Sequence, residues 1–485
     1  MKFLRPIFIC LIASSILLSC FEDQDDNLIA ASEINDFIWK GMNVVYLYKS
    51  EIPDLANDRF STIEEYSNYL NSFNTPESLF ESLIFDRQNI DKFSVLIPNY
   101  VEFLQQQQGI SINNGADFLF YLEPGSQTEV FGIVRLVYEG SPADNANLQR
   151  GQIFNAVDGI PLTTSNLGNL LNKDSYTLNL ADYNDNGTPA VDDDTIESNG
   201  QSVSLTKINF TRNPVVQSNI INLNSGNVGY LMYTSFNNNF ESELNAVFAN
   251  FAANNVQHLV IDLRYNPGGV INTAARLGSM ITGQFNGQVF SKLFYNEDLQ
   301  SNNTDFNFTN TITGGGAINS LNLEKVYIIT SERSASASEL LINSLEPYLE
   351  DVVHIGDITS GKTQASITIF DSPDLTIDGV NPSHTYAMQP LIAISVNKDD
   401  VEVPATGIVP DILLRESPRN FGILGDVNEP LLAAALADIE GLGRGFPISL
   451  ETLSPIDYKS KDDKFTDKLL ISPENFNFQK SLLLD

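Results

Sequence analysis

The spacing of apolar residues along the 485-residue chain changes from region to region, and each change predicts a different kind of structure. Between residues 35 and 108, apolar positions recur at helical spacing in "INDFIWKGMNVVYLY" and "SLFESLIF". Residues 109–212 hold short strand-like runs bounded by turn residues. In residues 213–441, buried strands such as "KVYIIT" alternate with helical stretches such as "ESELNAVFANFAANN". The pattern predicts a multidomain protein of mixed α/β and α+β class, with a helical N-terminal domain, a β-rich domain, an α/β core and a polar C-terminal extension, 442–485.

The first twenty residues, "MKFLRPIFICLIASSILLSC", predict an export signal over residues 1–19. They combine a basic start with an apolar run that is short for a membrane span. The end, "LLSC", resembles the lipobox of bacterial lipoproteins, which implies lipidation of Cys20; an ordinary signal peptide or a short anchor helix is the alternative. With the acidic tether 20–34 behind it, we expect an exported protein, lipid-anchored in the bacterial cell envelope and facing the periplasm or the outer-membrane surface.

Charge and metal-ligating residues narrow the possible partners. The net charge of −34 disfavours a nucleic-acid partner. The two cysteines, Cys10 and Cys20, lie in or next to the signal, so no disulfide is expected in the mature chain. The three histidines, His258, His354 and His384, are scattered and are interpreted as structural. The sequence therefore indicates no metal and no organic cofactor.

The stretch "GDITSGKT", residues 356–363, fits the nucleotide-binding pattern G-x-x-x-x-G-K-[ST]. Such a loop binds phosphates because a helix follows it directly, and the text after it, "QASITIF", predicts a strand instead. We therefore expect no nucleotide site. A desolvated, neutral lysine can also take the proton from a serine hydroxyl and activate it for attack on a carbonyl. Ser336, in "SERSASASELL", lies between a predicted buried strand and a predicted helix, where helix amides favour negative charge.

Three motifs in order resemble those of the C-terminal processing peptidases, or tail-specific proteases, which are serine endopeptidases with a Ser-Lys dyad and a ClpP/crotonase-like core. They are "DLRYNPGG" (262–269), "SASASE" (334–339) and "GDITSGK" (356–362), followed by "GIVPD" (407–411). With the β-rich region before them, the resemblance covers about two-thirds of the chain. It implies hydrolysis of peptide bonds, with Ser336 as the nucleophile and Lys362 as the general base.

The resemblance also implies supporting residues around the dyad. Glu339 and Thr359 match positions that support it, and Ser334 and Ser338 are structural, with Ser338 a candidate helix cap. The oxyanion hole would use the N–H of Ala337 and that of Gly268 or Gly269. Many relatives place a glutamine four positions after the lysine; here Ser366 stands there, and Gln364 is the nearest glutamine, so either could orient Lys362. A useful base needs a pKa near ~7–8 rather than ~10.4, which predicts an apolar pocket around the amine without a carboxylate in contact.

The segment "GSPADNANLQRGQIFNAVDG" resembles the PDZ domain of exported proteases, although Asn147 and Gln152 replace the usual glycine and aspartate. This implies that residues 109–212 bind polypeptide C-termini by strand addition, with a carboxylate nest near 108–113; a spacer or lid is the alternative. The stretch "DYNDNGTPAVDD" places Asp182, Asn184, Asn186, Gly187 and Asp193 at calcium-loop offsets. Its final Asp and the lack of flanking helices favour a polar hairpin loop.

The sequence therefore predicts an exported serine endopeptidase that cleaves exported or unfolded polypeptides through an acyl-enzyme. Its partners would be polypeptide substrates and, through Cys20, a membrane, with neither nucleic acid nor nucleotide. The alternative is a non-catalytic peptide- or glycan-binding surface lipoprotein on a protease scaffold.

Overall fold

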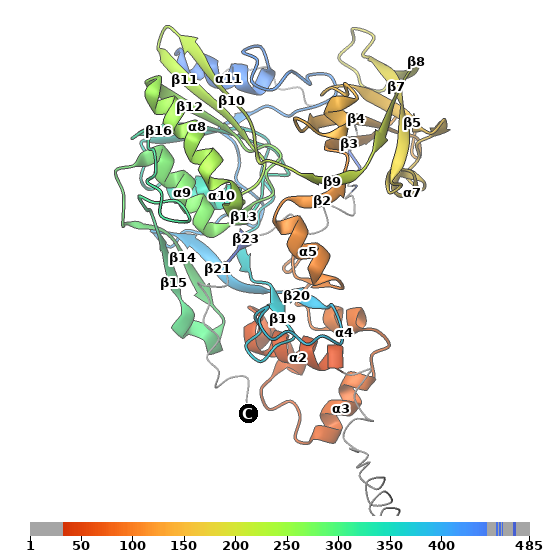
Figure 1. Ribbon diagram of the computed structural model, residues 1–485, viewed down its shortest axis with the longest axis vertical. Helices are drawn as coiled ribbons and strands as arrows, with labels where there is room; N and C mark the ends of the chain where they lie inside the picture. Colours follow the sequence, from red (N-terminus) through yellow and green to blue (C-terminus); the bar gives the residue numbers. More distant parts are fainter. Residues whose placement is uncertain (1–32, 444–452, 454, 457, 459–468, 472–485) are drawn as a thin grey trace, which may run out of the picture.

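The computed structural model describes residues 33–443, 453, 455, 456, 458 and 469–471. A helical part lies at one end of the molecule, and an α/β core and a β-rich part lie side by side at the other (Figure 1). The predicted fold class, mixed α/β with a helical N-terminal part and β-rich regions, is confirmed. The predicted export signal, Cys20 and most of the tether lie outside the described residues. Among the residues that are described, no helix has the length and apolar character needed to cross a membrane.

The helical part packs against the core through the apolar face of its first helix. Phe37, Ile38 and Met42 of that helix are buried in the same cluster as Ile369 and Met388 of the core. A single strand, β1, pairs antiparallel with β20 of the core, so the two parts also share a sheet. The elements are α2 (Glu33–Val45), η2 (Lys49–Glu51), η3 (Pro53–Leu55), α3 (Ile63–Asn71), α4 (Pro76–Ser82), β1 (Val95–Ile97) and α5 (Tyr100–Gln107).

The β-rich part contains an antiparallel sheet of order β3-β4-β5-β7-β8, with β6 beside β5, and a separate antiparallel pair formed by β2 and β9. Asp158 and Gly159 both have positive φ, 53° and 74°, as a tight hairpin turn between β5 and β6 requires. Asn147, at the position where glycine is usual, has φ 58°, a conformation that asparagine tolerates better than most residues. The elements are β2 (Ile110–Asn113), β3 (Ala116–Leu122), β4 (Val130–Val137), α6 (Pro142–Asn145), β5 (Ile153–Val157), β6 (Ile160–Pro161), α7 (Leu167–Leu171), β7 (Ser175–Asn184), β8 (Thr195–Thr206) and β9 (Ile208–Thr211).

The calcium-like stretch forms the loop of the β7–β8 hairpin, which confirms the hairpin interpretation. Its polar groups bond to one another: Thr188 Oγ1 donates to Asp193 Oδ1 at 2.8 Å, and the Asn186 amide donates to Asn184 Oδ1 at 3.0 Å. No group of three or more histidine, cysteine, aspartate or glutamate residues suited to a metal ion occurs in the described part of the chain.

The core contains a sheet of order β10-β11-β12-β16-β17-β22, in which every pair except β10–β11 is parallel. Helices α8, α9 and α10 bury apolar residues against one face, and α11 covers the other, which accounts for the near-continuous apolar text of the strands. The elements are β10 (Val215–Leu223), β11 (Gly226–Tyr233), η4 (Asn238–Phe240), α8 (Glu241–Ala253), β12 (Val256–Asp262), α9 (Ile271–Thr282), β16 (Lys325–Thr330), α10 (Ala337–Leu345), β17 (Asp351–Gly356), β22 (Ile412–Leu413) and α11 (Pro430–Ile439).

A second sheet of the core has the order β13-β23-β18-β21-β14-β15. Its strand β23 comes from the C-terminal extension, for which the sequence had predicted only polar text without a motif. A smaller sheet has the order β1-β20-β19. The elements are β13 (Gly269–Val270), β14 (Val289–Tyr295), η5 (Glu297–Asn302), β15 (Thr304–Asn307), β18 (Gln364–Ser366), β19 (Ile369–Phe370), β20 (Ala387–Gln389), β21 (Leu391–Asn397) and β23 (Leu469–Leu470).

Candidate active site

The three motifs singled out in the sequence meet at one edge of the parallel sheet. Strands β12, β16 and β17 are neighbours, and the motifs lie where these strands end, at Asp262, after Thr330 and after Gly356. Because the carboxyl ends of parallel strands share one edge, segments that lie up to a hundred residues apart in sequence converge there. This edge is the predicted site. The residues after Thr363 form strand β18, so the helix that a nucleotide-binding loop needs is absent from this described segment.

Ser336 occupies the N-cap position of α10 in an unusual backbone conformation, with φ 64° and ψ −112°. Ser336 is 1% exposed, and its Oγ has no hydrogen-bond partner within the described residues. Gly268 faces this hydroxyl so closely that a Cβ at position 268 would lie 2.9 Å from Oγ. A strained residue at a helix N-terminus, held by surrounding structure, is a common feature of functional sites.

The Glu339 carboxylate joins the two segments that carry Ser336 and Lys362. Its Oε2 accepts the backbone N–H of Ser336 at 2.8 Å and that of Lys362 at 2.9 Å. Its Oε1 accepts Thr359 Oγ1 and the Gly361 N–H, both at 2.6 Å. Burial raises the pKa of Glu339, although these four hydrogen bonds oppose the shift. One buried side chain thus sets the relative position of both predicted dyad segments.

The "GIVPD" motif fixes Thr359 from the other side. The Ile408 N–H donates to Thr359 Oγ1 at 2.7 Å, and the Thr359 N–H donates to the Ile408 carbonyl at 3.2 Å. A Cβ at Gly407 would lie 2.0 Å from the Thr359 carbonyl oxygen, so only glycine fits there. The motif therefore supports the loop that carries Lys362.

Lys362 is 1% exposed, and its Nζ lies 4.9 Å from the centre of the Phe93 ring. Phe93 belongs to the helical part, in which the sequence had shown no catalytic pattern. The ring is an apolar neighbour of the amine, and its face also attracts an ammonium, so this contact alone does not favour the neutral form. A single phenylalanine distant in sequence carries no motif, so no signal could have identified it.

Two candidates for the residue that orients Lys362 lie on β18. The Gln364 side chain is placed beside Tyr48 of the helical part, and burial raises the pKa of Tyr48 to about 12. Ser366 is fully buried, and its carbonyl accepts the Ile471 N–H at 3.1 Å. The orienting role of either residue stays a prediction.

The glycine turn that would supply oxyanion donors has positive φ at both residues, 116° for Gly268 and 136° for Gly269. The Gly268 N–H donates to Asn266 Oδ1 at 2.9 Å and is therefore occupied within its own turn. Ala337 is the first residue of α10, directly after Ser336. The oxyanion roles of Ala337 and of either glycine stay predictions.

Ser334 and Ser338 are structural residues that tie the serine-rich turn to the glycine turn. Ser334 Oγ donates to the Leu263 carbonyl at 2.8 Å, and Ser338 Oγ donates to the Asn266 carbonyl at 2.9 Å. The prediction that Ser338 caps the helix is wrong, because α10 begins at Ala337 and Ser338 lies inside it. Its hydroxyl instead joins the first turn of α10 to the segment of the glycine turn, a contact that sequence reasoning could not foresee.

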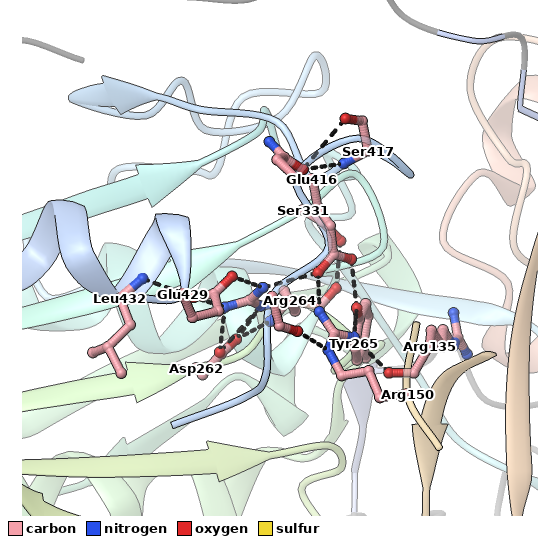
Figure 2. A network of polar contacts seen from close by, with 12 residues as sticks. Arg135, Arg150, Asp262, Arg264, Tyr265, Ser331, Glu416, Ser417, Glu429 and Leu432 are labelled. Carbon is pink, nitrogen blue, oxygen red and sulfur yellow. Dashed lines mark hydrogen bonds and ion pairs between the residues drawn. The ribbon is translucent and has the colours of Figure 1, made fainter. Parts of the chain in front are cut away.

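Behind this edge lies a buried ionic network centred on Arg264 of the "DLRYNPGG" motif (Figure 2). The Arg264 guanidinium is fully buried and pairs with Asp262 at 2.7 Å, Glu429 at 2.8 Å and Glu416 at 2.9 Å. Arg150 of the β-rich part also pairs with Glu416, at 2.5 Å. Although burial alone would raise it, the charges of Arg150 and Arg264 lower the pKa of Glu416 to about 2. The network fixes the motif and links the β-rich part to the core.

The histidines lie in contacts of other kinds, in line with their structural interpretation. His354 bonds to Thr330 Oγ1, His384 Nε2 lies 3.0 Å from Asp371 Oδ2, and His258 contacts the Ser225 carbonyl. Burial lowers the pKa of His354 to about 4.

A cavity of about 1290 Å³ opens beside the dyad. Gly269, Ala335 and Ser360, which flank the dyad segments, line it, together with residues of the helical part, the β-rich part and the C-terminal extension.

A buried serine at a helix N-terminus, a buried lysine in the loop between β17 and β18 and an adjoining cavity are features that a serine peptidase requires. Comparison with known proteins supports this class. The profile of peptidase family S41 matches residues 227–413, and that of the S41 N-terminal domain matches residues 33–95. The chain belongs to peptidase family S41, which confirms the predicted membership among the C-terminal processing serine peptidases.

Individual relatives agree with this assignment. A probable CtpA-like serine protease of Staphylococcus epidermidis is 30% identical over 138 residues, which cover 28% of this chain and 26% of that protein. Its counterpart in Staphylococcus aureus MRSA252 is 23% identical over 304 residues, 60% of this chain and 56% of that protein. A crystal structure from Bacteroides fragilis NCTC 9343, provisionally described as an S41 protease, has a TM-score of 0.68 at 25% identity and covers 84% of this chain and 97% of that one. The chain thus matches between about a quarter and just over half of the length of these curated relatives.

Proposed function

We propose that the chain is a serine endopeptidase that cleaves exported or unfolded polypeptides, with Ser336 as the nucleophile and Lys362 as the general base. The observation that carries the proposal is the Glu339 carboxylate, whose Oε2 accepts the backbone amides of both residues at 2.8 and 2.9 Å. Both residues are buried, each 1% exposed, as a site that excludes water requires.

The reaction proceeds in two steps that share one proton carrier. The neutral Lys362 amine takes the proton of Ser336 Oγ as this oxygen attacks the peptide carbonyl carbon. The resulting oxyanion accepts hydrogen bonds from the Ala337 N–H and from the glycine turn. Collapse breaks the C–N bond, and the leaving nitrogen takes the proton from the Lys362 ammonium, which leaves an ester on Ser336. Water then attacks the ester carbonyl carbon and gives a proton to Lys362. Collapse breaks the bond to Ser336 Oγ, which takes that proton back from the Lys362 ammonium, and a new carboxyl end is released with the enzyme restored.

Turnover of an unstructured protein such as casein tests this assignment. We expect Ser336→Ala and Lys362→Ala each to lower kcat by about 1000-fold or more, because nucleophile and base act as one unit. The exposed residues Ser72 and Lys40 provide matched controls as Ser72→Ala and Lys40→Ala, for which we expect unchanged turnover.

The alternative function is a non-catalytic peptide- or glycan-binding surface lipoprotein. Equal turnover by wild type and both dyad variants would refute the roles of Ser336 and Lys362. Absence of turnover in every variant, together with no labelling of Ser336 by a fluorophosphonate in the wild type, would favour the binding protein instead. Labelling that disappears in Lys362→Ala would separate the base from a merely structural lysine.

The β-rich part is included in this proposal as a PDZ-like domain that delivers substrates. Support comes from its matching motif and from Arg150, which pairs with Glu416 in the network behind the glycine turn. The N-terminal export signal and lipidation at Cys20 would hold the enzyme in the cell envelope. Metabolic labelling with a palmitate analogue, lost in Cys20→Ala, tests the anchor independently of the peptidase activity.

A further inference from the structure

The C-terminal extension returns to the core as a strand inserted between two others. Strand β23 pairs parallel to β13 on one side and to β18 on the other. Leu469 lies opposite both Gly269 and Ala365, and Leu470 lies opposite both Val270 and Ser366. Its backbone therefore fills a gap that would otherwise leave two strand edges without a neighbour.

This gap lies directly at the predicted dyad. Gly269 follows Gly268, where a Cβ would lie 2.9 Å from Ser336 Oγ, and Ala365 lies three residues after Lys362. The inserted strand thus runs between the segment beside the nucleophile and the segment that continues from the base. Ile471, directly after β23, is 3% exposed and packs in the main apolar cluster of the core.

The same extension binds the β-rich part at a second place. The Ile456 N–H donates to the Phe120 carbonyl at 2.9 Å, and Pro455 pairs antiparallel with Tyr121. The Tyr458 ring packs edge-on against Phe120, with 5.1 Å between ring centres. Since β3 is an edge strand of its sheet, this is strand addition, the mode by which such edges recognise extended peptides.

One cavity joins the two places. This cavity has a volume of about 1290 Å³, and its lining includes Pro455, Ile456 and Tyr458 from the contact with β3 and Leu470 and Ile471 from the gap between β13 and β18. Gly269, Ala335 and Ser360 beside the dyad line the same space. A single extended chain can therefore contact the β3 edge and the dyad at once.

We propose that the β3 edge and the gap between β13 and β18 form one two-part binding site for extended polypeptides, and that the C-terminal extension of this chain occupies it. The backbone edges tolerate many sequences, and the burial of Ile471 favours an apolar residue at that point of the occupant. This inference rests on the proposed function in one respect, because the extension can compete with a polypeptide substrate only if the chain is a peptidase. Because only the fraction with an empty gap binds substrate, KM rises by the inverse of that fraction while kcat stays constant.

Hydrogen exchange of the full-length protein in a Ser336→Ala background tests the binding site without any need for activity. We expect Ile471→Asp, which places a charge in the apolar cluster, to speed exchange of the backbone amide of residue 471, which donates to the Ser366 carbonyl at 3.1 Å, by at least tenfold relative to its intrinsic rate. Leu442→Asp, at a position that is 79% exposed, is the control and should leave this amide protected. Unchanged exchange in both Ile471→Asp and Leu470→Pro, with circular dichroism showing a folded protein, would overturn the proposal.

Kinetics with the active protein test the competition. On casein, Ile471→Asp should lower KM at least fivefold with unchanged kcat, and Ile456→Pro, which removes the amide bonded to Phe120, should lower it less. Wild type and Ile471→Asp with equal KM would refute the competition while leaving the peptidase assignment intact. Absence of turnover in all variants would instead refute the proposed function, and hydrogen exchange would still decide whether the extension occupies the gap.

Discussion

Two buried glutamates near the same sheet edge are held in opposite ways. Glu339 accepts hydrogen bonds from a hydroxyl and three backbone amides, and burial raises its pKa. Glu416 is held by two guanidinium groups, and its pKa falls to about 2. At Glu339 the hydrogen bonds from neutral donors lower the pKa less than burial raises it, whereas at Glu416 the nearby cations outweigh burial. The segments of Ser336 and Lys362 are thus joined by Glu339, which brings no cation next to the lysine. The cations of the charged network lie behind the site.

The largest effect is expected from removing the centre of the charged network. Arg264→Leu leaves Asp262, Glu416 and Glu429 without their shared cation, so we expect the free energy of unfolding to fall by about 3–5 kcal/mol. Denaturant unfolding measures this. The control is Arg59→Leu, which breaks an exposed pair with Asp54 and should change stability by about 1 kcal/mol or less. Similar losses in both variants would contradict the stabilising role of the network.

The hydrogen bonds around Glu339 are disrupted by Glu339→Gln. An amide cannot accept all four donors, so the segments of Ser336 and Lys362 lose their common anchor, and we expect casein turnover to fall about 100-fold, or ~2.7 kcal/mol. The control is Glu102→Gln on the exposed face of α5. A Glu339→Gln enzyme within threefold of wild type would show that Glu339 does not position the dyad.

The pH dependence of stability sharpens the comparison, because the two glutamates contribute with opposite sign. The lowered pKa of Glu416 gives stability that is present above the unfolded value of about 4.5 and is lost as pH falls toward 2. The raised pKa of Glu339 works the other way: stability is greatest below about 4.5 and decreases as pH rises toward the folded value.

We therefore expect Glu416→Gln to flatten the loss of stability between pH 4.5 and 2 by on the order of 2 kcal/mol. Glu339→Gln should remove a decrease that begins above pH 4.5. Unfolding by urea at a series of pH values measures both. The same sign of change in the two variants would contradict the comparison.

The smallest effect is expected at Thr359. Thr359→Val keeps the shape but removes the donor to Glu339 and the acceptor for the Ile408 amide, so stability should fall by about 1–2 kcal/mol. Thr359→Ser, which keeps the hydroxyl, should recover most of this loss. If the serine variant is as unstable as the valine variant, packing of the methyl group rather than the hydroxyl is responsible.

Much of this edge could be predicted from sequence, since each motif lies directly after a strand and neighbouring parallel strands bring their ends together. Ser336, Lys362, Glu339 and Thr359 are accordingly brought into one cluster. Contacts between distant parts of the chain could not be predicted. Arg150 meets Glu416 across 266 positions, and Phe93 reaches Lys362 from the helical part, because their partners are set by the packing of whole domains. In the extension, the apolar run "LLI" at 469–471 was the one available signal for β23.

The backbone geometry of Ser336 has a consequence for how the protein can change over generations. Its φ of 64° with ψ of −112° belongs to a region that glycine enters freely and other residues enter at a cost of about 1–3 kcal/mol. Replacement by glycine would abolish the nucleophile and relax the chain at the same point. The sequence "SAGAS" would thus give a more stable protein, and only selection for catalytic activity can keep a hydroxyl at that position.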